Sequence, residues 1–474
     1  EDKTKYNEIY KKLLDIGDII GIEGNLFKTM VGEKTIMVKD FIILNKSLKP
    51  LPIPKTDSEG KKYDEFTDPE LRYRQRYVDL ILNSSVKETF IKRTQIINSI
   101  RNFLNERSYI EVETPILQPI PGGASARPFV THHNTLNIPL YLRIANELYL
   151  KRLIVGGFDG VYEFSKDFRN EGMDKTHNPE FTVLELYVAY KDYFWMMKLT
   201  ENLLENVVNN LFGKTEIKFE KQLIDFTPPF KKVKFHDLIE ETTGKDISNM
   251  NLSELIEFAK EIKVEVDETM GVGKLTDQIF SEKCEKKLIQ PTFIIDYPKE
   301  MSPLTKTHRS NPKLTERFEL FVNGKEIANA YSELNDPIDQ LERFKDQLKL
   351  LEKGDEEAMF IDNDFIRSLE YGMPPTAGIG IGIDRLIMLL TNNTSIQEVL
   401  FFPQMKPEKK VIEMSFEEKL IISILKEKSP TSLKELKKKV GTSNTKFDKS
   451  LKKLVKNTLI KILKEKNEIL VYRY

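Results

Sequence analysis

The clearest helical pattern in the chain lies between residues 96 and 104. Apolar residues recur there at intervals of three and four, the spacing that places side chains on one face of a helix: Ile96, Ile97, Ile100, Phe103 and Leu104. A β-rich run follows at 109–114 and ends at Pro115, which cannot donate to a backbone ladder. The pattern therefore predicts a core helix followed directly by a short strand.

Two β-rich runs, residues 19–22 and 34–44, flank a turn at 31–33 near the start of the chain. They predict part of a small antiparallel sheet. Because two or three strands cannot bury a core alone, this segment is either a fragment of a barrel or an appendage packed on the rest. Repeated proline at 49–54 and the polar run at 55–64 predict a linker.

A long body follows from Asp68 to residue 407, in which helical and β-rich stretches alternate without an internal repeat. Charged amphipathic helices are predicted within residues 251–290 and 338–353. We expect them to form outer layers of the body and not walls of an active site.

The tail differs in charge from the rest of the chain. Residues 431–474 hold 13 Lys and Arg against four Asp and Glu, a local charge of +9, so the remainder carries −10. Three helices at 416–427, 432–440 and 445–457, then β-like runs at 459–463 and 469–472, predict a winged-helix-like module. Two interpretations stay open, contact with nucleic acid or a merely soluble Lys-rich appendage.

The composition is that of a globular protein with two or three domains, since 40% of its 474 residues are hydrophobic. The single Cys284 excludes an internal disulfide, and no apolar run approaches the roughly 20 residues of a membrane span. We therefore expect a cytoplasmic protein with no membrane partner. The five histidines show no zinc spacing, and hydrolase, P-loop and dinucleotide-binding motifs do not occur.

Three stretches could carry chemistry. Arg169 and Glu171 stand two apart on a β-rich segment, so their side chains would share one face; the alternative is a surface ion pair. Residues 317–333 place three carboxylates and an asparagine among apolar residues, which requires nearby cations unless the strand faces are exposed.

The third stretch, residues 378–390, alternates glycine with isoleucine and then begins a helix near Arg385. Alternate glycines leave one face of a strand bare, so that a flat ring or a backbone can approach it closely. Tight packing of the strand on the following helix is the alternative.

Together these stretches resemble, in order, the three motifs of the class II aminoacyl-tRNA synthetases: the helix ending at Thr114-Pro115, the Arg169-x-Glu171 pair, and the glycine run ending in Asp384-Arg385. Within that class the chain resembles the lysyl-tRNA synthetase family from residue 18 to 407. The residues that carry this closer resemblance are RYRQRY at 72–77, PGGA at 121–124, ANELYL at 145–150, the run 172–190 and NAYSELN at 329–335.

The resemblance implies ATP-dependent activation of L-lysine to lysyl-adenylate and transfer to the 3′ end of tRNA(Lys), with Mg²⁺ as cofactor. It implies two catalytic arginines, Arg169 between the lysine carboxylate and the α-phosphate, and Arg385 on the γ-phosphate side. The expected lysine-binding residues are Gly123, Glu147, Arg169, Glu185, Tyr187, Asn329 and Glu333. The expected ATP-binding residues are Arg169, Glu171, His177, Phe181, Glu326 and Arg385. The expected metal ligands are Glu319 and Glu326.

The implied fold is α+β, an antiparallel sheet flanked by helices. We expect a partial OB-fold anticodon-binding domain at 1–54, a linker at 55–70, a catalytic domain at 71–407 and a basic winged-helix-like extension at 408–474. The first half of the OB barrel is expected to precede Glu1, and a homodimer is expected to form through residues 96–115. Two other functions stay open: a ligase that transfers lysine to a protein acceptor, and a non-catalytic RNA-binding paralogue.

Overall fold

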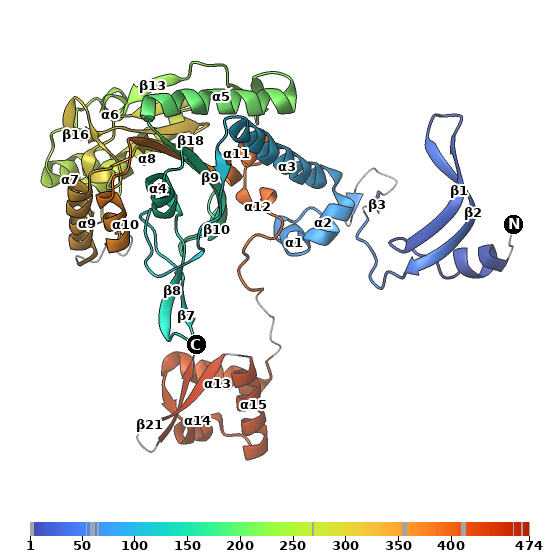
Figure 1. Cartoon of the computed structure of the whole chain (residues 1–474). Helices are drawn as coiled ribbons and strands as arrows, with labels where there is room; N and C mark the ends of the chain where they lie inside the picture. The colour runs from blue at the N-terminus through green and yellow to red at the C-terminus, as the bar shows by residue number, and fades with distance from the viewer. Residues whose placement is uncertain are drawn as a thin grey trace. The chain divides into compact units, whose positions relative to one another are not determined.

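The computed structural model describes residues 4–53, 55–56, 62–63, 66–267, 270–352, 358–408, 414–457, 459–465 and 468–473. The chain divides into two compact units, Glu1–Gln404 and Met405–Tyr474, whose elements are labelled in Figure 1. The finer division predicted above stays a prediction. In the described part of the chain, every helix is too short or too polar to cross a membrane.

The N-terminal segment forms the predicted antiparallel pair. After a π-helix, η1 (Lys5–Tyr10), β1 (Ile19–Lys28) pairs with β2 (Lys34–Asn45), both longer than the sequence pattern predicts. Nearly all of their side chains are exposed or half-buried, as expected of two strands without a core of their own. A two-residue pair, β3 (Lys55–Thr56) with β4 (Lys62–Tyr63), lies in the predicted linker; Pro54, 57–61 and 64–65 lie outside the described residues.

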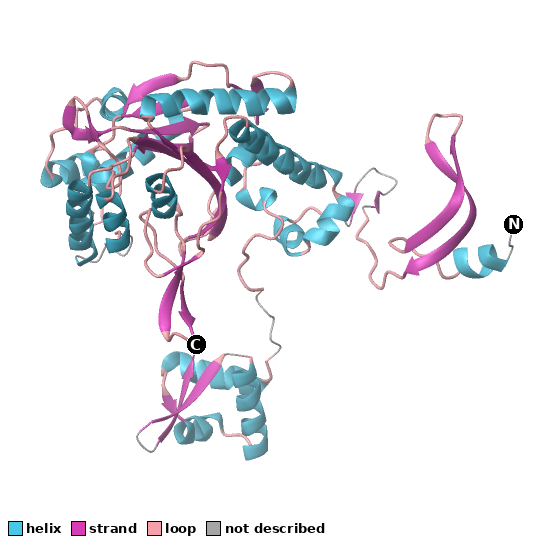
Figure 2. Cartoon of the chain, in the orientation of Figure 1, coloured by secondary structure: helices cyan, strands magenta, loops and turns pink. Residues whose placement is uncertain are grey.

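An eight-stranded sheet organises the larger unit. Its strands run in the order β13 (Lys231–Lys234), β14 (Thr292–Ile295), β17 (Arg317–Val322), β18 (Lys325–Ser332), β19 (Thr376–Gly382), β10 (Glu180–Ala189), β9 (Gly160–Phe168) and β5 (Ile110–Glu111). The six strands from β14 to β9 pair antiparallel, and only β13 and β5 at the edges run parallel to their neighbours. The predicted α+β sheet is confirmed (Figure 2).

Helices cover both faces of this sheet. The helices of this unit are α1 (Pro69–Arg74), α2 (Arg76–Leu82), α3 (Ser84–Asn105), α4 (Glu147–Val155), α5 (Tyr193–Phe212), α6 (Phe235–Thr243), α7 (Leu252–Glu261), α8 (Val272–Lys283), α9 (Pro337–Glu352), α10 (Asn363–Glu370), α11 (Ile383–Leu390) and α12 (Ile396–Val399). The helix predicted around residues 96–104 is α3, and the strand predicted after it is reduced to the short β5.

Short pieces complete the unit: β6 (Leu117–Gln118), β7 (Val130–His133) and β8 (Ile138–Leu142) in one small sheet, the pairs β11 (Glu216–Phe219) with β12 (Gln222–Asp225) and β15 (Thr307–His308) with β16 (Asn311–Thr315), and the 3-10 turns η2 (Glu285–Lys287) and η3 (Lys299–Met301).

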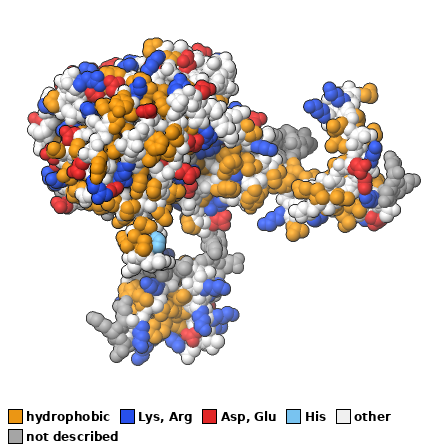
Figure 3. All heavy atoms as spheres, in the orientation of Figure 1, with side chains coloured by type: hydrophobic (Ala, Val, Ile, Leu, Met, Phe, Trp, Pro, Cys, Tyr) orange, Lys and Arg blue, Asp and Glu red, His pale blue; other side chains and the backbone are white. Residues whose placement is uncertain are grey.

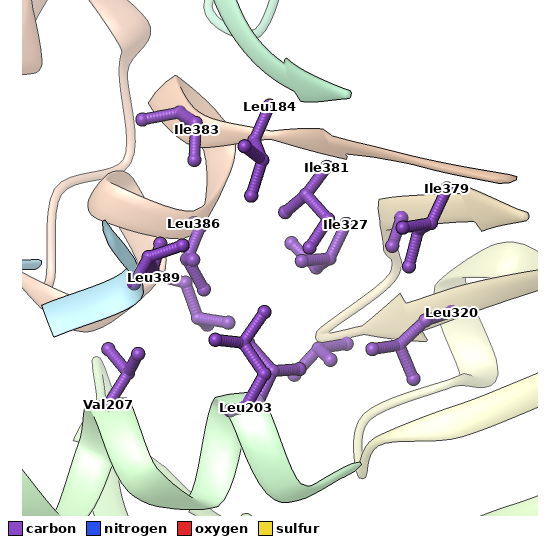
Figure 4. Packing of buried hydrophobic residues seen from close by; sticks show 14 of the residues in the cluster. Leu184, Leu203, Val207, Leu320, Ile327, Ile379, Ile381, Ile383, Leu386 and Leu389 are labelled. Carbon is purple, nitrogen blue, oxygen red and sulfur yellow. The ribbon is translucent and has the colours of Figure 1, made fainter. Parts of the chain in front are cut away.

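One face of the sheet carries the main hydrophobic core. Leu184 of β10, Leu320 of β17 and Ile379 and Ile381 of β19 pack there against α5, represented by Leu203, and against α11 (Figure 4). Alternate residues of the same strands point to the other face. Each strand therefore supplies apolar side chains to the core at every second position and presents the residues between them to the opposite face.

The opposite face is covered at its two ends and not in the middle. Around β14 and β17 it packs on a cluster built from α6, α7 and α8, which includes Phe235 and Phe321. Around β9 and β10 it packs on a second cluster built from α4, α9 and α10, which includes Tyr187 and Phe365. The region between these two clusters is where a cavity can form.

A buried arginine joins the start of this unit to its end. Arg76 is fully buried, forms an ion pair with Asp79, and donates to the backbone carbonyls of Gln397, Leu400 and Phe401. Next to these carbonyls, the backbone N–H of Ile396 donates to the carbonyl of Lys175 at 2.7 Å. This chain of contacts fixes the loop between β9 and β10 from outside the sheet.

The smaller unit has the predicted winged-helix-like arrangement. Its elements are α13 (Phe416–Glu427), β20 (Thr431–Ser432), α14 (Leu433–Val440), α15 (Asn444–Lys456), β21 (Ile460–Glu465) and β22 (Glu468–Arg473). The strands form a sheet in the order β20, β22, β21. Ile421, Leu436, Phe447 and Leu454 lie in a core of its own, so this unit is stabilised by contacts within itself.

Candidate active site

A cavity of about 580 Å³ opens on the uncovered middle of the sheet, between the two helical clusters. Most of the side chains singled out in the sequence line it. They are Gly123, Glu147, Arg169, Glu171, His177, Phe181, Glu185, Tyr187, Glu326, Asn329 and Arg385. Glu319 and Glu333 lie directly behind this lining, in contact with residues that belong to it.

The floor of the cavity is the glycine face of β19. A Cβ atom at Gly378 would lie 2.0 Å from Oε1 of Glu333 and 2.5 Å from Cε1 of Tyr187, and one at Gly380 would lie 2.8 Å from Oε1 of Glu185. Contacts this short cannot form, so glycine is required for these side chains to lie across the strand. The bare strand face predicted from the sequence is confirmed, and it is filled by the protein's own side chains.

A buried lysine lies between two of the predicted lysine-binding carboxylates. Lys151 is fully buried; its Nζ donates to Oε1 of Glu147 at 2.5 Å and forms an ion pair with Glu333. The hydroxyl of Tyr331 donates to the other oxygen of Glu147 at 2.6 Å. Oε1 of Glu333 is buried and accepts no hydrogen bond from the described residues. One carboxylate oxygen of this cluster is therefore left for a further donor.

Burial sets the protonation of this cluster. Burial raises the pKa of Glu185 and of Glu333 well above the ordinary range, and the carboxylate of Glu147 acts in the same direction on both. The ammonium of Lys151 partly opposes the rise at Glu333, and the hydroxyl of Tyr187, 2.9 Å from Glu185, partly opposes it at Glu185. A cation placed among these groups favours their ionised forms.

A second cluster lies across β17 and β18. The guanidinium of Arg317 donates to Oε1 of Glu319 at 2.6 Å and to Oδ1 of Asn329 at 3.1 Å, and the hydroxyl of Tyr297 donates to Oε2 of Glu319 at 2.9 Å. Burial raises the pKa of Glu319, while the charge of Arg317 opposes the rise. Arg317 thus fixes the orientation of Asn329 and of the carboxylate beside it.

At the other end of the cavity, a chain of contacts holds Arg385. Its guanidinium donates to Oε2 of Glu326 at 3.1 Å and to Nε2 of His177 at 3.1 Å. Because Arg385 can only donate, Nε2 of His177 accepts, and its proton lies on Nδ1, which is 2.8 Å from Asp174. The arginine is held at both sides by side chains from different elements.

Arg169 and Glu171 are not on a strand, so the prediction that their side chains share one strand face is wrong. The strand β9 ends at Phe168, and both residues belong to the loop that leads to β10. The guanidinium of Arg169 lies over the ring of Phe181, with its carbon 5.1 Å from the ring centre, and its Nε is buried without a partner in the described residues. The arginine therefore faces the cavity with an unused donor.

The expectation that the helices at 251–290 and 338–353 are outer layers only is also wrong. The first turns of α8 contribute Gly273, Lys274 and Asp277 to the cavity, and α9 contributes Gln347 and Leu350. Burial raises the pKa of Asp277, with Glu326 acting in the same direction. The polar and apolar residues of α8 and α9 alternate as in solvated surface helices, so the sequence pattern did not indicate that these helices line a cavity.

Lys151, Arg317 and Tyr331 are the functional candidates that the sequence reasoning missed. A local signal existed for two of them: Lys151 follows Glu147 by four residues on α4, and Arg317 precedes Glu319 by two on β17. Such pairs are usually surface ion pairs. Their burial beneath a cavity becomes visible only in the folded structure.

Within the described residues, no three His, Cys, Asp or Glu side chains are grouped so as to hold a metal ion. Glu319 and Glu326 stand on adjacent antiparallel strands, where the register pairs Glu319 with Asn329 and Phe321 with Glu326. Their seven-residue separation therefore places the two carboxylates on neighbouring strands of the sheet.

The packing of Glu333 and Tyr187 on β19 predicts that Gly378→Ala destabilises the larger unit. We expect a loss of about 1–3 kcal/mol in the free energy of unfolding, because one of the buried side chains must leave its position. Urea unfolding followed by the fluorescence of Trp195, the single tryptophan, which packs against the main core, measures this loss. The matched control is Gly271→Ala, whose added Cβ meets open space. Equal stability of the two variants would contradict the proposed crowding.

Comparison with known proteins identifies the family. A sequence model of the family described as tRNA synthetases class II (D, K and N) matches residues 68–406. A lysine–tRNA ligase of Christiangramia forsetii is 68% identical over 465 residues, which cover 98% of this chain and 82% of the relative. A lysine–tRNA ligase of Porphyromonas gingivalis is 66% identical over 409 residues, covering 86% of this chain and 71% of the relative.

A third relative extends the same pattern. The lysine–tRNA ligase of Azobacteroides pseudotrichonymphae is 64% identical over 409 residues, which cover 86% of this chain and 82% of the relative. The family match takes in the whole eight-stranded sheet and every element that lines the cavity. The chain belongs to the class II tRNA synthetases of the D, K and N group and, within it, to the lysine–tRNA ligases.

Proposed function

We propose that the protein activates L-lysine with ATP to lysyl-adenylate and transfers the lysyl group to the 3′ end of tRNA(Lys). The observation that carries the proposal is a set of carboxyl groups, the buried Glu147 and Glu333 and the half-buried Glu185, on a cavity that also presents Arg169 and Arg385. A substrate with two ammonium groups and one carboxylate complements such a site. The family membership and the names of the relatives support the same assignment.

The proposed lysine site follows from this charge distribution. Glu333 and the hydroxyl of Tyr187 receive the ε-ammonium, because Oε1 of Glu333 is buried without a donor. Glu147, Glu185 and the backbone of Gly123 receive the α-ammonium. An uncharged side chain of similar length would leave buried anions unpaired, at a cost of several kcal/mol, and is therefore rejected.

Lys151 balances part of the negative charge of this cluster and does not bind the substrate. With three carboxylates and one internal ammonium, the cluster retains two negative charges when ionised, and the two ammonium groups of lysine balance them. Lys151 keeps Glu147 and Glu333 oriented through its short contacts to both. It is a positioning residue and does not touch the reacting atoms.

The carboxylate of lysine is proposed to lie between Asn329 and Arg169. Arg317 orients the amide of Asn329, and Arg169 has an unused donor at Nε. Attack of a carboxylate on the α-phosphate brings two anions together, so a planar cation between them lowers the barrier. The attacking oxygen is already ionised, and no general base is required. The rate enhancement comes from positioning and charge stabilisation.

The proposed ATP site occupies the other half of the cavity. Adenine stacks on the ring of Phe181, and the guanidinium of Arg169 also lies over this ring. Glu171 and His177 contact the nucleotide from the loop before β10, and Arg385 neutralises the departing pyrophosphate. Glu326 and His177 already orient Arg385, so little reorganisation is needed.

Mg²⁺ is the cofactor we propose, held by Glu319 and Glu326. Magnesium in ATP sites takes one or two protein carboxylates and completes its coordination with phosphate oxygens and water, which fits a pair of carboxylates on neighbouring strands. When bound, it supplies positive charge to the phosphates. Because Arg317 and Tyr297 donate hydrogen bonds to Glu319, its two oxygens are oriented before any metal binds.

The assembly and location of the protein are also proposals. We infer a cytoplasmic homodimer that forms through α3 and the segment after it. Apolar side chains that are half exposed on this part of the surface support it: Ile91, Ile110, Ile116 and Leu117.

The direct test is ATP–pyrophosphate exchange measured with each of the twenty amino acids in the absence of tRNA, followed by charging of a tRNA(Lys) transcript. The proposal predicts exchange with lysine alone and charging of that transcript. Exchange with no amino acid, by folded protein that binds ATP, would overturn it.

Replacement of Glu333 separates the lysine site from the ATP site. Glu333→Gln removes the anion facing the ε-ammonium, so we expect the KM for lysine to rise about 30-fold or more, equivalent to about 2 kcal/mol, with the KM for ATP nearly unchanged. Glu370→Gln, an exposed position on α10, is the matched control. Equal increases in both KM values for Glu333→Gln would show that Glu333 has another role.

A further inference from the structure

The C-terminal unit has a charge distribution that adenylate formation does not explain. Its acidic residues concentrate on α13, where Glu417 and Glu418 lie in the first turn. Lysines are frequent on α14, α15 and β21, and Figure 3 shows Lys and Arg side chains on the surface of this unit. Since α14 and α15 are joined by residues 441–443, the basic elements form a helix–turn–helix arrangement followed by a β-hairpin.

Some of these lysines have a structural partner and others do not. Lys446 and Lys453 pair with Glu417 and Glu418 of α13, at 3.9 and 3.1 Å, and Lys439 pairs with Glu435 at 3.1 Å. On α14 and α15, the lysines with neither a carboxylate partner nor an aromatic contact among the described residues are Lys434, Lys438, Lys449, Lys452 and Lys456. Among the described residues these five ammonium groups form no ion pair, so they remain available to a ligand.

The unpaired lysines share one side of their helices. On α15, Phe447, Leu451 and Leu454 are buried, and the helical period places residues 449, 452 and 456 on the opposite side. On α14, Leu436 and Val440 are buried, and the same argument places residues 434 and 438 outward. The outward sides of both helices therefore carry five lysines, which we call the lysine face, with the exposed Asp448 beside them on α15.

We infer that the lysine face binds the phosphate backbone of the tRNA substrate. Its groups are ammonium ions on flexible stems, which act as point charges toward phosphate, and Phe447, the single aromatic residue of the described α14 and α15, is buried in the core. Bases are therefore not stacked or read on this face. It contributes affinity without sequence specificity.

The choice of tRNA among polyanions rests on the proposed function. The same chain carries the class II catalytic unit, so a tRNA held by that unit meets the lysine face at a high effective concentration. Weak contacts to a few phosphates are then sufficient to lengthen the lifetime of the complex.

Charge reversal on the lysine face of the full chain tests this inference. We expect Lys449→Glu with Lys456→Glu to weaken binding of a tRNA(Lys) transcript about tenfold or more, and to reduce the slope of log affinity against log salt by about 2. Fluorescence anisotropy at several salt concentrations measures both quantities. The milder pair Lys449→Gln and Lys456→Gln is expected to change them in the same direction, which excludes an effect of misfolding.

The matched control lies on α13, where Lys419 and Lys426 are exposed and have the same seven-residue spacing. Their reversal to Glu is expected to change tRNA affinity by less than twofold, and lysine-dependent pyrophosphate exchange stays unchanged in every variant. Equal losses from the two pairs, or no loss from either, would overturn the inference. So would variants of the lysine face that keep full tRNA affinity and instead lose binding to phosphatidylglycerol vesicles. Failure of exchange in the unmodified chain would count against the proposed function and not against the lysine face.

Discussion

The structure depends on one constraint, the burial of several carboxyl groups on one face of a β-sheet. Glu147 and Glu333 are buried, and Glu185 is half-buried beside them on the cavity wall, where an unpaired anion is costly. Lys151 and the hydroxyls of Tyr187 and Tyr331 hydrogen-bond to these carboxylates. Oε1 of Glu333 has no hydrogen-bond partner among the described residues. The carboxylate oxygens that lack a partner define the substrate, because a ligand with ammonium groups supplies the missing donors and positive charge.

The sheet makes this arrangement possible through its two-residue period. Strands β10 and β19 turn Leu184 and Ile379 toward the main core, while Glu185 and Gly378 face the cavity. A stable, well-packed core on one face holds the strands still, and glycines on the other face make room for side chains that lie flat on the strand. One face of these strands thus stabilises the fold, and the opposite face of the same strands forms the binding site.

Sequence patterns were sufficient for those parts that depend on local periodicity. The helix around Ile100, the glycine strand before Arg385 and the elements of the C-terminal unit each follow from spacing alone, and the structure confirms them. The strand that was expected to carry Arg169 ends one residue earlier, because the chain must leave the sheet there to form a loop beside Phe181. Lys151 and Arg317 could not be predicted, since their burial is decided by strands and helices distant in sequence. The same applies to Asp277, whose helix has the pattern of a solvated surface element.

We propose that lysine binding releases protons from the cluster of Glu147, Glu185 and Glu333. Burial raises the pKa of Glu185 and Glu333, and the ammonium groups of lysine lower these pKa values on binding. The most direct measurement is calorimetric titration of the enzyme with L-lysine in two buffers of different ionisation enthalpy, repeated at several pH values. We expect net proton release on lysine binding, which declines as the pH increases through the raised pKa values while the affinity for lysine rises. Proton uptake, or no proton exchange at any pH, would contradict it.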